Sequence, residues 1–429
     1  MQLSDSLKAR YLCLQILTGV FKKRKSVSHI LESQRVSVSF YKDSDVAIAK
    51  RLSDFIFLHL NSVDYCIDLY VKKNIKLEVR NILRLVIAEY VNKGSPDYAI
   101  VNSAVKLAKL NKASSFFSGL VNAIARKLVL NLRKNELVFK PELQANFRIN
   151  LRKYYTEDVI QKLEKLITKR APIDITISDK KDINFFRKQL NAIELPTGTL
   201  RLENSKGFAQ LNGFRTGKWW VQGVSSSIPV KLLGNIYGLE VLDLFSAPGG
   251  KAMQLISAGA RVTCLDLSLK RIETLKQNLC RMNMEAEIIQ ANIERFRTEK
   301  KYDIIVIDVP CSSSGTFRKN KDLLHLNPTE RVYSLKKIQA YTLEAAKAWI
   351  KDNGTILYCA CSLFPEEGEN QTKRFLINNE DWMQKVICPA KFDLEGDWVD
   401  KHGGLRLRPD HLFDFGGMDG FYASLLIKK

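Results

Sequence analysis

Two cysteines lie in polar motifs that could bring a thiol to a reacting atom. Cys311 belongs to Asp-Val-Pro-Cys-Ser at 308–312, and Cys361 belongs to Cys-Ala-Cys-Ser at 359–362, which soon runs into Pro-Glu-Glu. Each motif closes an apolar run that is typical of a strand. A buried cysteine is usually an inert small hydrophobic residue, but a thiolate at a strand end beside a polar turn can act as a nucleophile. We therefore interpret these two thiols as candidates for covalent catalysis.

A glycine-rich turn, Asp-Leu-Phe-Ser-Ala-Pro-Gly-Gly-Lys at 243–251, follows an earlier apolar run. Glycines let the backbone pass close to a ligand and turn sharply into the next helix. The spacing is neither that of a dinucleotide-binding motif nor that of a nucleoside triphosphate loop. Asp266 ends the next strand, where a carboxylate can accept ribose hydroxyls, and Asn292 follows the third, where an amide can meet an adenine edge. Together these residues predict an adenosine-type ligand across the first three strands.

These motifs must be positioned by a sheet whose strands end at one rim. Apolar runs alternate with amphipathic stretches, which favours a doubly wound, mostly parallel sheet with helices on both faces. Ligands bind such sheets at the carboxyl ends of the strands. The predicted strands cover 240–245, 261–267, 286–290, 302–309 and 355–361, and the predicted helices cover 251–258, 268–282, 331–352 and 366–378.

The rest of the chain is organised differently. Residues 1–137 have apolar residues at helical spacing and predict an all-helical domain. Over 138–236 we expect a linker and a small α/β RNA-binding module, because Ile173, Ile175 and Ile177 alternate with polar residues and the segment is basic. Further strands are predicted near 200–202 and 219–221. With 237–429 as a Rossmann-like α/β domain, the 429 residues divide into three parts, which suits a chain too long for one core.

The positive charge is concentrated away from the chemical motifs. The net charge is +21, of which 12 come from residues 1–137, 8 from 138–236 and 1 from 237–429. Lys106, Lys109 and Lys112 follow one another on a predicted helix face without nearby acids. A basic region joined to a near-neutral one predicts a part that docks on nucleic acid and a part that performs catalysis.

Several classes of protein are disfavoured. The eight cysteines match no zinc spacing and the five histidines form no cluster, so we expect reduced thiols and no metal. No apolar run approaches the length of a membrane span, and the first ten residues have no apolar signal segment. We expect a cytoplasmic, unprocessed protein.

At this point the motifs resemble those of the RNA cytosine-5 methyltransferase family. The resemblance rests on both cysteine motifs, on the Ala-Pro-Gly-Gly-Lys turn at 247–251 and on Asp-Gly-Phe-Tyr-Ala at 419–423. Residues 1–137, with Leu-Val-Asn-Ala-Ile at 120–124, resemble a helical RNA-binding domain of the NusB type. This domain order is similar to that of the bacterial RsmB-type branch, which implies 16S ribosomal RNA, or a small-subunit precursor that contains it, as the substrate. We expect a monomer.

The resemblance also implies roles for individual residues. Cys361 would attack C6 of the cytosine, and Cys311 would assist the later release of the product. Asp308 would bind the N3/N4 edge of the base, and Lys251 would help to hold the base. The implied cofactor is S-adenosylmethionine. Its expected binding residues are Phe245, Ser246, Ala247, Pro248, Gly249, Gly250, Lys251, Asp266, Arg271, Asn292 and Asp308.

Three positions depart from the family pattern. Gly223 and Asn292 each replace an Asp, and Ala360 replaces a Thr. These departures leave open a second hypothesis, an RNA-binding assembly factor with weakened catalysis. A DNA cytosine methyltransferase is a third, although those enzymes usually have Gln where Ser312 follows Cys311 here. Enzymes that methylate amino groups carry Asn/Asp-Pro-Pro-Tyr, which differs from the motif at 308–311. Gly223 in particular removes a potential hydrogen-bond partner from its motif and leaves the local packing of that motif open.

Overall fold

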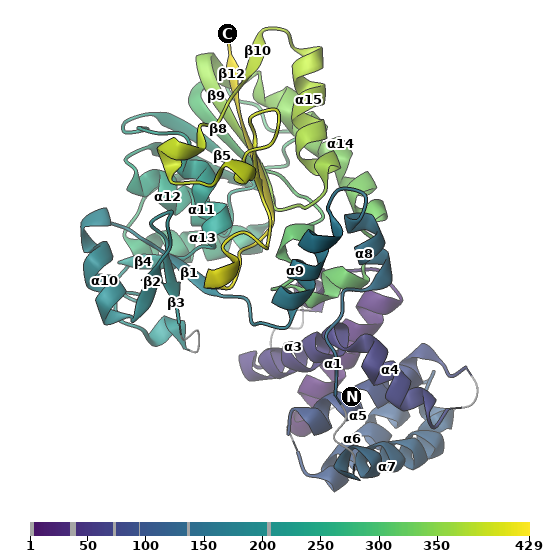
Figure 1. Ribbon diagram of the computed structural model, residues 1–429. Coiled ribbons are helices and arrows are strands. Elements are labelled where there is room, and N and C mark those ends of the chain that lie inside the picture. The colour runs from purple at the N-terminus through teal and green to yellow at the C-terminus, as the bar shows by residue number, and fades with distance from the viewer. Residues whose placement is uncertain (1–3, 35–39, 72–73, 94, 135–137, 204–206) are drawn as a thin grey trace. The chain divides into compact units, whose positions relative to one another are not determined.

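The computed structural model describes residues 4–34, 40–71, 74–93, 95–134, 138–203 and 207–429. The chain forms two compact units (Figure 1). One contains Met1–Asn150 and Lys319–Asn327, and the other contains Leu151–Arg318 and Pro328–Lys429. The first unit is helical, and the second is built on a mixed, mostly parallel sheet. This agrees with the predicted fold class.

The helical unit is arranged around α5, Leu77–Val91. Its residues 81–89 are all buried, and a helix that is apolar on most sides belongs at the centre of a bundle. α1, α3, α4, α6 and α7 pack against it. The helices of this unit are α1 Asp5–Phe21, α2 Val27–Gln34, α3 Asp43–Leu58, α4 Leu60–Asp68, α5, α6 Asp97–Leu110 and α7 Ser118–Lys134, and α8 Ala145–Leu151 lies at its boundary.

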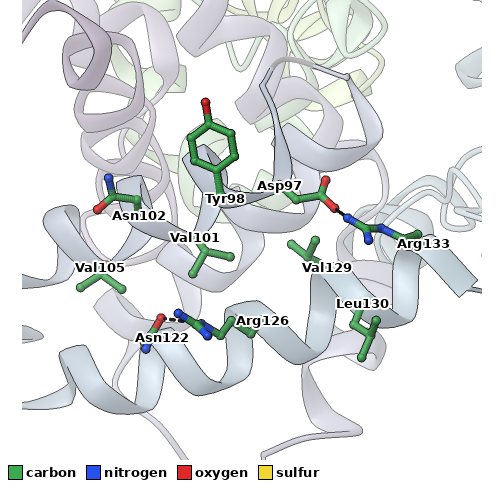
Figure 2. Close-up of a pocket in the computed structure, with 10 residues that line it drawn as sticks. All are labelled: Asp97, Tyr98, Val101, Asn102, Val105, Asn122, Arg126, Val129, Leu130 and Arg133. Atoms are coloured by element: carbon green, nitrogen blue, oxygen red, sulfur yellow. Dashed lines mark hydrogen bonds and ion pairs between the residues drawn. The ribbon is translucent and has the colours of Figure 1, made fainter.

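A groove of about 720 Å³ lies between α6 and α7 (Figure 2). Its lining combines apolar side chains with basic and polar ones. Tyr98 in this lining is 77% exposed. Arg126 donates a hydrogen bond to Asn122, and Arg133 is paired with Asp97. The groove is lined by Asp97, Tyr98, Val101, Asn102, Val105, Asn122, Arg126, Val129, Leu130 and Arg133.

The helical unit also contains a segment from far along the chain, Lys319–Asn327. Asp322 in this segment accepts a hydrogen bond of 2.9 Å from the backbone N–H of Val27 at the start of α2. The ring of His325 lies against Phe21 and Phe57 and is 2.7 Å from the Phe57 carbonyl oxygen. Burial lowers the pKa of His325 to about 4, so the ring is neutral at physiological pH.

The second unit begins with α9, Glu157–Ile167, and a four-stranded antiparallel module. The strand order is β2-β3-β1-β4, with β1 Ile173–Ile177, β2 Ala192–Glu194, β3 Leu200–Leu202 and β4 Trp219–Val221. α10, Ile183–Gln189, precedes β2. The predicted strands near 173–177, 200–202 and 219–221 are confirmed. β2 was not predicted, because its three residues include two exposed ones and no apolar alternation.

The larger sheet has eight strands and the order β10-β12-β9-β8-β5-β6-β7, with β11 paired to β12. β5 to β9 are parallel, and β12 joins β9 in the antiparallel direction. The strands are β5 Glu240–Leu244, β6 Arg261–Asp266, β7 Glu287–Gln290, β8 Tyr302–Asp308, β9 Ile350–Ala360, β10 Trp382–Lys385, β11 Leu405–Leu407 and β12 Phe421–Lys428.

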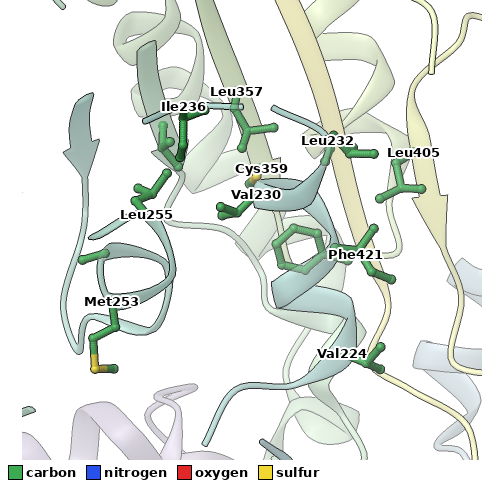
Figure 3. Packing of buried hydrophobic residues seen from close by; sticks show 14 of the residues in the cluster. Val224, Val230, Leu232, Ile236, Met253, Leu255, Leu357, Cys359, Leu405 and Phe421 are labelled. Carbon is green, nitrogen blue, oxygen red and sulfur yellow. The ribbon is translucent and has the colours of Figure 1, made fainter. Parts of the chain in front are cut away.

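Helices cover both faces of this sheet, which explains why its strands are continuous apolar runs. α11 Val224–Lys231, α12 Gly250–Ser257 and α13 Leu269–Met282 lie on one face, and α14 Pro328–Ala346 and α15 Glu369–Asn378 lie on the other (Figure 1). Alternate strand residues enter the two cores. Cys359 packs with α11 and α12 residues (Figure 3), whereas Tyr358 packs with the α14 side.

The predicted boundary between one helix and the strand that follows it is wrong. The helix expected at 331–352 ends at Ala346, and Ile350 already belongs to β9. The apolar pattern continues through Trp349 and Ile350, so periodicity alone could not separate the helix from the strand. The backbone separates them, because Trp349 accepts a hydrogen bond of 2.8 Å from the N–H of Tyr302 in β8.

Among the described residues, no helix is both long and apolar enough to cross a membrane. Within the same ranges, no three His, Cys, Asp or Glu side chains are grouped so that they could hold a metal ion.

Candidate active site

The candidate site lies where the strand order of the large sheet reverses. The chain runs from β5 outward through β6 and β7, and then returns to the other side of β5 as β8. Such a reversal leaves a crevice at the carboxyl ends of the two central strands. β8 ends at Asp308, and the loop after β5 leads into α12, which carries Lys251.

Lys251 and Asp308 form an ion pair of 2.8 Å in this crevice. The Lys251 side chain is 5% exposed and also donates to the Ser226 hydroxyl at 3.3 Å, and its ammonium lies 5.0 Å from the centre of the Phe421 ring. Burial disfavours the charged lysine, but Asp308, Cys359 and Asp243 together outweigh it and raise the pKa of Lys251 above its usual value. The Asp308 side chain is 37% exposed, so a ligand can reach it.

Asp243 at the end of β5 is a second, deeply buried carboxyl group. It is 1% exposed and accepts a hydrogen bond of 2.7 Å from Ser246 through Oδ2. Its Oδ1 is buried without a hydrogen-bond partner. Burial raises the pKa of Asp243 to about 7, opposed by the Ser246 hydrogen bond and the charge of Lys251. The carboxyl group is therefore partly protonated at neutral pH.

The two candidate thiols meet just beyond the ends of the adjacent strands β8 and β9. Cys311 Sγ and Cys361 Sγ are 3.2 Å apart, so the two cysteine motifs bring their thiols into contact. Cys311 is buried and Cys361 is half-buried. The hydrogen bond to Cys361 and burial raise the pKa of Cys311 well above its usual value, and the charges of Cys361 and Glu367 add to this. Cys311 is therefore a protonated thiol at neutral pH.

A buried carboxylate joins the two cysteine loops. Glu367 is fully buried and accepts hydrogen bonds from the backbone N–H and the hydroxyl of Ser312, at 2.8 and 2.5 Å. Gln339 of α14 donates to it at 3.1 Å. On the other side, the hydroxyls of Ser312 and Ser314 lie 3.4 and 3.1 Å from that of Ser362. The loop that carries Cys311 is thus hydrogen-bonded both to Glu367 and to Ser362, which follows Cys361.

The expected adenosine site lies at the ends of β5, β6 and β7. Asp266 is 2% exposed, and its two oxygens accept from the backbone N–H groups of Ala247 and Ser268, at 3.2 and 3.0 Å. Arg271 of α13 forms an ion pair of 3.3 Å with Asp266 and also donates to the carbonyl of Ala247. Asn292 accepts from the N–H of Glu294 at 2.9 Å. The side chains of Asp266 and Asn292 thus accept hydrogen bonds from backbone N–H groups of nearby turns.

The turn at 245–250 has a conformation that only glycine allows at one point. Gly249 has φ of +103°, and a Cβ there would lie 2.5 Å from Leu275 Cδ1. α12 begins at the next residue, so its first N–H groups face the rim of the sheet. Phe245, Ser246 and Pro248 belong to the same turn, and the 246 and 249 backbones are joined by a hydrogen bond of 2.9 Å.

The structure shows how the three departures are accommodated. At Gly223 the N-cap makes no side-chain hydrogen bond, and Asp174 of β1 instead accepts a hydrogen bond of 3.0 Å from the N–H of Val224, the first residue of α11. Ala360 is fully buried in the core on the α14 side. Asn292 retains a polar side chain that closes the turn after β7.

Of the sequence-predicted residues, Lys251 contacts Asp308, and Cys311 contacts Cys361. Asp266 and Arg271 form a separate group, while Asn292 bonds within its own turn. The sequence reasoning missed Asp243, Ser226, Glu367 and Asp174. Glu367 lies inside the Pro-Glu-Glu motif and Ser226 lies shortly after Gly223, whereas Asp174 gave no signal because its partners are far away in the sequence.

Comparison with known proteins gives two matching families. Residues 233–427 match the family described as 16S rRNA methyltransferase RsmB/F. Residues 7–129 match the NusB family. The first range covers the large sheet and both cysteine loops, and the second covers most of the helical unit.

Similar proteins include three described as ribosomal RNA small subunit methyltransferase B. That of Pasteurella multocida is 26% identical and matches 98% of this chain and 96% of its own length. That of Cronobacter sakazakii is 26% identical over the whole of both chains. That of Erwinia tasmaniensis is 33% identical, but over only 54% of this chain and 52% of its own length.

Solved structures share the fold. The crystal structure titled PH0851 is 18% identical, has a TM-score of 0.73 and covers 100% of both chains. The structure of NSun6 from Pyrococcus horikoshii with SFG is 15% identical and has a TM-score of 0.55, over 66% of this chain and 98% of that one.

Proposed function

Since its domain at 233–427 belongs to the RsmB/F family of 16S rRNA methyltransferases, we propose that this S-adenosylmethionine-dependent methyltransferase methylates C5 of a cytosine in 16S ribosomal RNA. The observation that carries the proposal is the 3.2 Å separation of Cys311 Sγ and Cys361 Sγ. The strand that precedes Cys311 ends in Asp308, which is paired with Lys251. Two thiols beside a polar pair suit an attack on a pyrimidine followed by a separate release step.

The residues at the sheet rim fit the proposed cofactor. S-adenosylmethionine supplies an electrophilic methyl group on a sulfonium sulfur. The turn at 245–250 and the first N–H groups of α12 would hold its amino-acid end, since helix N-termini bind carboxylates. Asp266 would accept the ribose hydroxyls once Arg271, whose side chain is 44% exposed, turns away. Asn292 would bond the adenine edge.

The proposed chemistry begins with Cys361. C5 of cytosine is a weak nucleophile until a thiolate adds to C6, which forms a sulfur–carbon bond and moves the ring electrons to C5. Negative charge then develops at the N3 side of the ring. Asp308 would bond that edge, and the buried ammonium of Lys251 beside it would offset the charge. The target base must first leave its stack to reach these groups.

The remaining steps restore the enzyme. C5 would then take the methyl group that the cofactor supplies. A base removes the hydrogen on C5 as a proton, the C5–C6 double bond re-forms, and the bond between C6 and Cys361 Sγ breaks with its electron pair on sulfur. Cys311 is a neutral thiol that contacts that sulfur. It would stabilise the departing thiolate by donating its S–H, and this supports its role in release.

The proposal is tested with RNA that contains 5-fluorocytosine, because fluorine cannot leave as the C5 proton does and the covalent adduct is trapped. We expect Cys361→Ala to abolish both methyl transfer and the adduct, measured by a gel shift under denaturing conditions. The exposed Cys388 lies in the same unit, so Cys388→Ala is the matched control and should behave like the wild type. An adduct formed by Cys361→Ala would mean that another residue is the nucleophile.

The substrate itself is tested in cells. Bisulfite mapping of ribosomal RNA from cells with and without this gene should reveal one or more 16S cytosines whose C5 methylation depends on it. Identical maps would contradict the proposed substrate while leaving methyl transfer to another RNA to be tested in vitro.

We also propose that the groove between α6 and α7 contributes to RNA binding. Residues 97–134 contain seven Lys or Arg and one acidic residue, Asp97, which Arg133 neutralises. Arg126 and the exposed ring of Tyr98 lie at this groove (Figure 2). Cations attract the phosphates, and an exposed aromatic ring can stack on an unpaired base. An acidic protein segment is the competing occupant.

A further inference from the structure

The start of α11 lacks a capping side chain of its own. The first N–H groups of a helix need acceptors from outside the helix, and Ser, Thr, Asp or Asn at the N-cap usually supplies one. Here the N-cap is Gly223, with φ of −60° and ψ of 142° and no side-chain hydrogen bond. That backbone conformation is open to any residue, so glycine is not required there for geometric reasons.

The acceptor comes instead from another strand. Asp174 of β1 is 4% exposed and accepts from the N–H of Val224 at 3.0 Å through Oδ2. The Asp174 carbonyl also accepts from the N–H of Gln222 at 3.0 Å. A carboxylate at this position is further stabilised by the positive end of the helix dipole.

Asp174 is itself held in place by Arg201, its direct cross-strand neighbour on β3. The guanidinium binds both carboxylate oxygens, at 2.7 and 3.1 Å, which fixes the plane of the carboxylate. Arg201 also donates to the carbonyls of Phe415 and Gly417, at 2.6 and 2.8 Å. The arginine is 3% exposed, so the small module and the loop before β12 share one buried charge pair.

The first turn of α11 leads directly to the ion pair of the candidate site. Ser225 donates to the carbonyl of Asp419 at 2.7 Å, and Ser226 accepts from Lys251 at 3.3 Å. On the same helix, Val224 packs in the core that contains Phe421 (Figure 3). A shift of this turn would therefore move the hydroxyl that orients the Lys251 ammonium.

We propose that Asp174, held by Arg201, is a positioning residue for Lys251. By capping α11 it fixes Ser226, and Ser226 holds the ammonium of Lys251 against Asp308. The inference deepens the proposed function, because it assumes that Lys251 and Asp308 act on the substrate base. It assigns a task in the reaction to the small module, which contains none of the proposed catalytic groups.

The first test does not depend on activity. Lys251 in the full-length protein is labelled with acetic anhydride over a range of pH, and its modification is followed by mass spectrometry of the peptide that contains it. Asp174→Asn and Ser226→Ala should each increase the labelling rate of Lys251, because each removes part of what immobilises the amine. An unchanged labelling rate in both variants would overturn the inference.

The second test measures methyl transfer and rescue. Asp174→Asn should lower kcat by about 10²-fold, the scale of a small misplacement of a reacting group, with little change in KM for S-adenosylmethionine. Gly223→Asp in the same chain supplies a capping carboxylate from the N-cap itself and should restore most of the lost kcat. Failure of that restoration would contradict the capping role.

Two further variants keep the test decisive. Asp179 caps a short 3-10 turn in the same module, so Asp179→Asn removes a similar charge and should leave kcat unchanged. Ser226→Ala leaves the buried pair of Asp174 and Arg201 intact, so it tests the contact between Ser226 and Lys251 even if Asp174→Asn does not fold. An unchanged kcat in Ser226→Ala would overturn the inference. If the wild type forms no 5-fluorocytosine adduct, the proposed function fails, whereas the Lys251 labelling still decides the positioning role.

Discussion

Asp243 combines deep burial with an oxygen that has no hydrogen-bond partner. Its pKa rises from 3.8 to about 7 on folding, so between these values the folded protein binds more protons than the unfolded chain. Stability therefore falls as the pH rises through this window. We expect Asp243→Asn to remove this dependence and to be more stable than the wild type above pH 7, by on the order of 2–4 kcal/mol.

The measurement is tryptophan fluorescence during urea unfolding at several pH values. All five tryptophans, at positions 219, 220, 349, 382 and 398, belong to the sheet unit, so the signal reports on that unit alone. An equal difference between variant and wild type at pH 5 and pH 8 would contradict the assignment of the titration to Asp243.

Cys311 is the residue with the most specific kinetic prediction. Its Sγ lies 3.2 Å from the sulfur that must leave the base, so Cys311→Ala should permit attack and methyl transfer but slow the release. A protein–RNA adduct should then accumulate with ordinary cytosine RNA and not only with the fluorinated analogue. Multiple turnovers at the wild-type rate, without any adduct, would remove Cys311 from the release step.

For single residues, the sequence identifies reactive side chains that stand in recognisable motifs. Cys311, Cys361, Lys251 and Asp308 stand in short motifs, and the structure pairs them. Asp174 could not be found in this way, because its contacts with Arg201 and Val224 depend on strand register rather than on a local pattern.

Glu367 is a buried carboxylate that helps to hold the loops that carry the two cysteines. Glu367→Ala would leave the N–H of Ser312 and the amide of Gln339 buried without this acceptor, which should lower the free energy of unfolding of the sheet unit by about 2–4 kcal/mol. Glu367→Gln keeps one acceptor oxygen and should recover most of this stability. The exposed Glu380 provides the control variant, Glu380→Ala. Equal stability of the Ala and Gln variants at 367 would contradict the role of its hydrogen bonds.

Among the elements, the long buried strands of the sheet were predictable and the short or atypical ones were not. Continuous apolar runs bounded by polar turns predicted β5, β6 and β8 closely. β2 is too short and too exposed to give a signal. The boundary between α14 and β9 was missed because both are apolar and only strand pairing distinguishes them.

At the scale of the whole molecule, the charge distribution predicts how RNA binding responds to salt. Arg126→Ala should weaken RNA binding and reduce the slope of log affinity against log salt by about 0.7–0.9 for each phosphate that the variant no longer neutralises. Tyr98→Ala should weaken binding without changing that slope, because stacking releases no counterions. The exposed Arg51 on α3 of the same unit gives the control, Arg51→Ala. A wild-type affinity and slope in Arg126→Ala would favour a protein segment as the occupant of the groove.

The segment Lys319–Asn327 has a consequence for how this protein can be dissected. It leaves the sheet unit just after the Cys311 loop and buries Leu323, Leu324 and Leu326 in the helical unit. In a truncated chain that starts after residue 150, these leucines would be exposed to water, and His325 would lose its contacts with Phe21 and Phe57. The helical unit therefore cannot be exchanged on its own. A chimera that replaces residues 1–150 must also replace Lys319–Asn327 with the matching segment. Otherwise we expect it to aggregate through these exposed leucines, whether or not RNA is present.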